Sequence, residues 1–167
     1  FLYLQEPNSA SRNPDDLHFA IASRLSHFLW NTRPDAELMS HAQKHQLQDA
    51  KILQSEVDRL IESEQFEDFI NSFTDYWLSL KEIRRDEPDS RLYPEYRFDD
   101  YLIESMEAET RAFFKLMLRD NLPVTALIDT DFVLVNDRLS RHYEIDPVSG
   151  SKLRKVQLPE SSPMVVC

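Results

Sequence analysis

Glycine is almost absent from this chain of 167 residues, which contains a single one, Gly150. Loops that cradle phosphate groups need several glycines, because their backbone N–H groups must approach the ligand closely. The sequence therefore excludes Walker-type, dinucleotide-binding and nucleophile-elbow motifs in their usual glycine-rich forms. Turns and helix ends must instead use asparagine, aspartate and the nine prolines.

Cysteine and long apolar runs are also scarce. The only cysteine is the last residue, Cys167, so neither an internal disulfide nor the Cys-x-x-Cys-His motif of covalent haem attachment can form. No stretch of about 18 consecutive apolar residues is present, so we expect no membrane insertion. The first residues do not have the pattern of a secretory signal peptide, and because the sequence starts at Phe1 rather than at methionine, we expect it to be a fragment of a longer protein.

Basic residues are few as well. The chain has 19 lysines and arginines against 30 acidic residues, which gives a formal net charge of −11. Contacts to phosphate groups need clustered basic side chains, and only short pairs such as Arg84-Arg85 and Arg154-Lys155 occur. Nucleic acid is therefore not expected as a partner.

The chain does contain the apolar periodicity of a helical protein. We predict an all-α fold, an irregular bundle of five or six helices with a long ordered loop and room for a short β segment near the C-terminus. Asn13, Asp49 and Asn136 are predicted helix caps. The predicted helices span residues 14–30, 34–45, 49–61, 65–80, 99–119 and 136–143, with a short helical turn at 123–128. Extended segments are predicted at 132–135 and 152–158, and the loop at 82–100, held to the core by Leu92, Tyr93 and Tyr96.

Two apolar stripes predict which helix faces are buried. On the first helix the stripe contains Leu17, Ile21, Leu25, Phe28 and Leu29, with Arg24 and His27 on its edge and Trp30 nearly opposite. On the fourth helix the stripe contains Phe66, Phe69, Ile70, Phe73, Trp77 and Leu80. Both patterns are typical of core helices, so the stretch from Ser23 to Leu38 is explained without a ligand.

Several segments, in order, carry a family resemblance. They are ASRLSHFLW with RPDAEL, FTDYWLSL, LYPEY, EAETRAFF and DTDFVLVNDRLSRHYEI, between residues 22 and 145. Together they resemble planctomycete-specific domain four (domain of unknown function 1592), a domain of large planctomycete proteins. The resemblance implies a helical domain over residues 13–146, with residues 1–12 as the tail of a preceding domain and 147–167 as the start of a following one.

The resemblance also implies a cellular context. Such multidomain bacterial proteins often carry a separate c-type cytochrome domain, so haem c is expected elsewhere in the parent protein and no cofactor in this chain. Neighbouring domains of the same polypeptide, a cytochrome domain among them, are the implied partners, and the periplasm or cell envelope is the implied location. The family offers no established catalytic residues. Two positions depart from it, because His27 replaces a tyrosine and Glu144 stands where glycine is usual.

Metal-ligating patterns are weak. His41 and His45 are four residues apart, which on a helix would place both imidazoles on one face for Zn²⁺ or Cu²⁺. Asp129, Asp131 and Asp137 form an acidic cluster that lacks the glycine of a calcium loop. We favour a solvated helix end for the histidines and capping roles for the acids. Axial haem ligation by His27 or Met39 is a further alternative, although a core histidine is the commoner role.

Catalytic patterns are equally weak. Glu104 and Glu107 share a face of the long predicted helix, Glu109 points away from both, and His142 is the nearest candidate partner. Surface charge pairs, such as Glu107 with Arg111, are the simpler interpretation. The leading hypothesis is a structural or interaction module. The alternatives are a hydrolase that uses these carboxylates with His142, and a redox partner that presents its acidic surface to a cytochrome.

Overall fold

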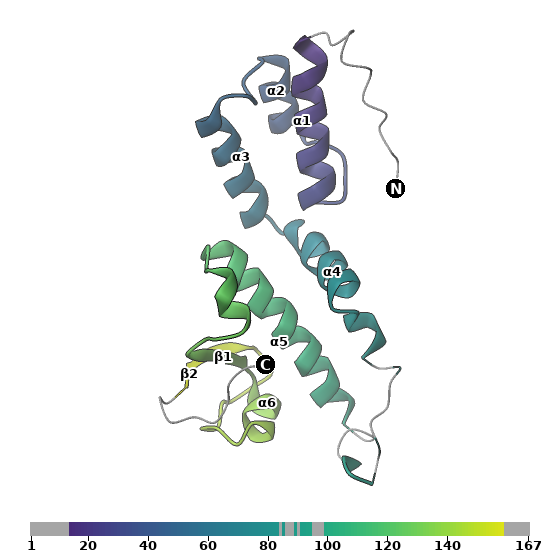
Figure 1. The fold of residues 1–167 in the computed structure, drawn as a ribbon, viewed down its shortest axis with the longest axis vertical. Helices are drawn as coiled ribbons and strands as arrows, with labels where there is room; N and C mark the ends of the chain where they lie inside the picture. The colour runs from purple at the N-terminus through teal and green to yellow at the C-terminus, as the bar shows by residue number, and fades with distance from the viewer. Residues whose placement is uncertain (1–13, 84, 86–88, 90, 95–98, 159–167) are drawn as a thin grey trace. The chain divides into compact units, whose positions relative to one another are not determined.

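The computed structural model describes residues 14–83, 85, 89, 91–94 and 99–158. These residues form six α-helices, two short 3₁₀ helices and two strands (Figure 1). The predicted mostly helical fold with a short β segment is confirmed. In this part of the chain no helix is both long enough and apolar enough to cross a bilayer. The chain divides into two compact units, residues 1–69 and 70–167, and each is described separately below.

The first unit contains α1 (Pro14–Leu29), α2 (Ala36–Gln43), α3 (Ala50–Glu62) and the first turn of α4 (Phe66–Trp77). Figure 1 shows α1, α2 and α3 as the purple to blue helices, with α2 and α3 both packed on α1. Asp49 caps α3, as predicted, by accepting hydrogen bonds from the backbone N–H groups of Lys51 and Ile52. The second helix begins at Ala36 rather than at Pro34, because the carboxylate of Asp35 caps it.

The buried face of α1 differs from the predicted stripe. Ala22 and Ser26 are fully buried, and together with His18 and Leu29 they form the face that packs on the neighbouring helices. Phe28, which was predicted to be in the core, is 64% exposed and instead contacts the ring of Phe69. Small side chains allow two helices to approach closely, so the tightest contact formed along the small residues rather than along the bulky ones.

The second unit contains the rest of α4, α5 (Asp100–Arg119), α6 (Asp137–His142) and two short strands. The 3₁₀ helices η2 (Leu80–Glu82) and η4 (Val124–Leu127) connect these elements. Strand β1 (Phe132–Val135) pairs antiparallel with β2 (Arg154–Gln157), as the yellow-green part of Figure 1 shows. The core between α5, β1 and α6 is made by Leu102, Val133, Val135 and Leu139.

Asn136 connects this core to α5. Its side-chain oxygen accepts hydrogen bonds from the backbone N–H groups of Arg138 and Leu139, so it caps α6 as predicted. Its amide group donates to the hydroxyl of Ser105 on α5 at 2.8 Å, and both side chains are buried. The cap therefore also fixes the position of α6 on α5.

Backbone positions with positive φ are occupied mostly by residues other than glycine. Asn31 and Asn121 follow α1 and α5 with φ of 52° and 49°, which agrees with the prediction that asparagine ends helices here. The other positive-φ positions among the residues that the structure describes are His45, Ser79, Glu144 and Gly150. Glu144 has φ of 54°, and it stands at a position where the family resemblance implies glycine.

The loop prediction is corrected in part. Leu92 is 72% and Tyr93 50% exposed, so neither side chain is enclosed in a core as predicted, while Tyr96 lies outside the described residues. The segment carries a local ion pair instead, because Asp89 accepts hydrogen bonds from the guanidinium of Arg91.

Candidate functional site

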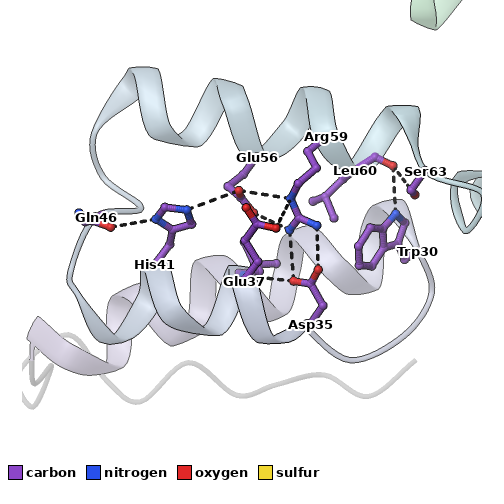
Figure 2. A network of polar contacts seen from close by, with 10 residues as sticks. Trp30, Asp35, Glu37, His41, Gln46, Glu56, Arg59, Leu60 and Ser63 are labelled. Carbon is purple, nitrogen blue, oxygen red and sulfur yellow. Dashed lines mark hydrogen bonds and ion pairs between the residues drawn. The ribbon is translucent and has the colours of Figure 1, made fainter.

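The densest polar network among the described residues is centred on Arg59 of α3 (Figure 2). Its guanidinium donates to Asp35 Oδ2 and to Glu56 Oε2, both at 2.7 Å. Because Glu56 and, to a smaller extent, Asp35 accept these hydrogen bonds, the pKa of Arg59 lies well above its usual value. Burial alone would raise the pKa of Asp35, but hydrogen bonds from Arg59 and from the backbone N–H of Leu38 lower it.

The network has a structural role. Asp35 caps α2 and at the same time binds Arg59, so one carboxylate fixes the start of α2 against the middle of α3. The side chain of Glu56 is only 4% exposed, and its charge is compensated by Arg59.

A second set of groups extends this network along α2. His41 Nε2 lies 3.6 Å from Glu56 Oε1, and Glu37 Oε2 lies 3.6 Å from Arg59 Nε. Figure 2 shows Gln46 on the far side of the imidazole, with its Oε1 at 2.9 Å from His41 Nδ1. Glu37, His41 and Glu56 each offer one ligand atom, and these three atoms lie within 4.8 Å of one another. No other group of three or more His, Cys, Asp or Glu residues in the described part of the chain does so.

The two histidines that the sequence pairs do not share a face. Helix α2 ends at Gln43, and His45 has φ of 55°, so the chain turns before His45 is reached. The ring of His45 packs edge-on against His18 at 5.2 Å, while His41 faces Glu56. The helical spacing of His41 and His45 was thus misleading because the helix stops between them.

Asp129 and Asp131, the other metal candidates, are exposed residues on either side of Thr130, just before β1. The backbone oxygen of Asp131 accepts a hydrogen bond from the N–H of Leu158. Asp137 is engaged elsewhere, since its carboxylate accepts from the hydroxyl of Tyr101 at 2.8 Å. Asp137 lies in the first turn of α6, but the cap of that helix is Asn136, so Asp137 does not cap it.

The catalytic candidates lie on α5 and at the end of α6. Glu104 is exposed on α5, and Glu107 lies 3.8 Å from Arg111, which is the expected pair one turn apart. Arg111 also donates to Asp75 on α4 at 2.6 Å. His142 lies at the end of α6, where its ring contacts Tyr143. Within the described residues these candidates form no group like that of Glu37, His41 and Glu56.

Glu109 is the carboxyl whose environment is most unusual. Burial raises its pKa to about 7, although the hydroxyl of Tyr143, which donates to Oε2 at 2.6 Å, acts in the opposite direction. The sequence held a signal for this burial, because Glu109 continues an apolar series on one face of α5. That series is Leu102, Met106, Glu109 and Phe113, with spacings of four, three and four residues.

An exposed group of apolar side chains, here named the α4 aromatic surface, consists of Phe73, Tyr76, Trp77 and Leu78. Phe73 is 37% exposed, Tyr76 88%, Trp77 47% and Leu78 41%. The predicted burial of this helix is confirmed at Phe66, Ile70 and Leu80 but is wrong at Phe73 and Trp77. In this part of α4 the fully buried residues are Ile70 and Thr74, so the contact face of the helix lies beside the aromatic stripe.

Comparison with protein-family models gives a match over residues 17–145 to a family described as a protein of unknown function (DUF1592, also called PSD4). Neither the comparison with curated proteins nor the comparison with solved structures gives a match. The matched region includes both the Arg59 network and the α4 aromatic surface. Because the family model covers more than half of the sequence, the chain belongs to the DUF1592 family.

Proposed function

We propose that this domain is a non-catalytic interaction module and that its α4 aromatic surface docks onto a neighbouring domain of the same polypeptide. The exposure of Tyr76 and Trp77, two consecutive residues at the end of α4, carries the proposal. Aromatic side chains are enriched in protein interfaces, and contiguous exposed apolar groups mark interaction sites more often than single ones do.

Two of the aromatic side chains, those of Phe73 and Trp77, are held in place before any partner binds. The ring of Phe73 stacks on Phe114 of α5 with a centroid distance of 5.1 Å and an interplanar angle of 6°, and Trp77 contacts the same ring at 5.9 Å. An anchor that is already ordered loses little conformational entropy on binding. Asp75, between the aromatic residues, is neutralised by Arg111, so the apolar surface carries no uncompensated carboxylate at that position.

The wider context is proposed from the resemblance alone. We place the parent protein in the periplasm or cell envelope, with haem c in another domain and none in this chain. A cytochrome domain is one candidate neighbour. The net charge of −11 would favour a partner with a basic rim around its apolar contact area.

An enzymatic role is the second candidate, and Glu109 is the observation that favours it. A carboxyl with a pKa of about 7 is suited to general acid–base catalysis. Burial and the hydrogen bond from Tyr143 explain this pKa without a substrate. We therefore rank a hydrolase or redox-partner role below the interaction module.

Hydrogen–deuterium exchange tests the proposal. Backbone amides from residues 70 to 80 are compared between the isolated chain and a longer polypeptide that includes the flanking domains. We expect slower exchange over α4 and η2 in the longer polypeptide, because a docked domain would cover this helix end. Equal exchange in the two polypeptides would reject docking at this surface.

A further inference from the structure

We propose that Glu37, His41 and Glu56 form a binding site for one divalent transition-metal ion, with Zn²⁺ as the best match. One imidazole nitrogen and two carboxylate oxygens are common zinc ligands, and a set of three leaves a coordination position open. The proposal is independent of the docking function, because the site lies on α2 and α3 in the first unit.

The imidazole of His41 is oriented as a metal ligand would be. Gln46 Oε1 lies 2.9 Å from Nδ1 and can only accept, so the proton of the neutral ring is on Nδ1. The lone pair of Nε2 is then directed toward Glu56 Oε1, 3.6 Å away. Metal-binding histidines usually donate their other ring N–H to an oxygen in this way, which fixes the tautomer and the ring orientation.

The distances are close to those of a zinc site. Two ligands bound at about 2.1 Å in tetrahedral geometry are separated by about 3.4 Å, and the Nε2 to Oε1 distance is 3.6 Å. The side chain of Glu56 is 4% exposed and fixed, whereas that of Glu37 is 59% exposed. Glu37 can therefore close the remaining distance by a rotamer change in solvent.

The local charge favours a divalent cation. Asp35, Glu37 and Glu56 contribute three negative charges and Arg59 one positive charge, so with neutral His41 the cluster has a formal charge of −2. Arg59 is bound most closely to Oε2 of Glu56, at 2.7 Å, and its Nε is 3.3 Å from Oε1. A metal on Oε1 would lengthen the weaker contact and leave the stronger one in place.

Calorimetric titration with Zn²⁺ alone tests the proposal. The chain carries Cys167→Ser as a background change, which removes the only thiol. We expect one ion per chain, and an affinity at least about tenfold lower in His41→Gln and in Glu37→Gln. His27→Gln is the matched control, because His27 is an exposed histidine of the same unit whose ring binds its own helix at the carbonyl oxygen of Ser23.

Gln46 provides a second, sharper test. Gln46→Leu removes the acceptor for Nδ1–H and should weaken Zn²⁺ binding by about 10- to 100-fold. Gln46→Glu keeps an acceptor at this position and should retain the affinity for Zn²⁺. Absence of Zn²⁺ binding to the unmutated cluster would overturn the proposal, and His41 would then serve only as a partner of Glu56. Binding that survives His41→Gln but is lost in His45→Gln would also overturn it, because the ion would then lie at the His18–His45 pair.

Discussion

The hydroxyl of Tyr143 donates a hydrogen bond of 2.6 Å to Oε2 of Glu109, and this contact joins the end of α6 to the middle of α5. The carboxyl group is largely buried, and this burial raises its pKa from 4.5 to about 7. A proton is thus bound more tightly in the folded chain than in the unfolded chain, which makes the stability of this unit depend on pH.

Glu109→Gln should remove this pH dependence. Because the folded-state pKa is raised, the stabilising effect of the proton is complete below about pH 4.5 and is lost as the pH rises through about 7. Between pH 4.5 and 8 the unmodified chain should therefore lose up to about 3 kcal/mol of unfolding free energy relative to the variant. Urea denaturation at pH 5, 6, 7 and 8 measures the difference. Parallel pH profiles of the two proteins would contradict the assignment.

Tyr143→Phe is the complementary control. It removes the hydrogen bond that lowers the pKa of Glu109, so this pKa should rise above about 7 while the ring remains. The expected cost in stability is about 1 kcal/mol. Titration of the Glu109 carboxyl carbon by NMR gives the pKa directly, and an unchanged value would show that the hydrogen bond is not formed in solution.

Arg59→Met should be among the most destabilising changes in the first unit. It leaves Glu56 buried without its cation, which typically costs about 3 kcal/mol. The double variant with Glu56→Gln should lose less than the sum of the two single variants, because the uncompensated charge is then gone. A double-mutant cycle by urea denaturation measures this coupling, and additive losses would mean that the two side chains do not interact.

Glu144→Gly should stabilise the second unit by up to about 1 kcal/mol. Glu144 has φ of 54°, a conformation that costs a residue with a Cβ atom more than it costs glycine. Asp146→Gly is the control, since it also removes a carboxylate nearby at an exposed position without positive φ. Asp146→Gly should lower the stability of the second unit slightly. A loss of thermal stability in Glu144→Gly would refute this explanation of why the family resemblance implies glycine there.

Local signals in the sequence predicted much of the fold. Asp49 and Asn136 cap helices where expected, since a cap depends only on residues within one turn. The buried face of α1 was not predictable from hydrophobicity alone, because the small residues Ala22 and Ser26 form the close contact and Phe28 does not. The pairing of β1 with β2 depends on residues about 20 positions apart, so no local pattern specifies it.

The candidate metal site was only partly predictable. His41 was a candidate ligand in the sequence, but its partner Glu56 is on another helix. The spacing paired His41 with His45 instead, and His45 lies beyond the end of the helix. Tertiary packing of α2 and α3 determines such a cluster, whereas spacing within a helix does not. Glu109 could have been found, because a glutamate in an apolar heptad series indicates a buried carboxyl.

The most direct test of docking compares the affinities of two tyrosine variants for the neighbouring domain that we propose as the partner, supplied as a separate chain in a calorimeter. Tyr76→Ala alters the α4 aromatic surface, and Tyr93→Ala alters an exposed tyrosine in another segment of the same unit. Because Tyr76 is 88% exposed, its removal should change stability by less than about 0.5 kcal/mol. We predict that Tyr76→Ala weakens binding at least about tenfold while Tyr93→Ala leaves it unchanged. Equal affinities of Tyr76→Ala and the unmodified chain would contradict the proposal that this surface docks a neighbouring domain.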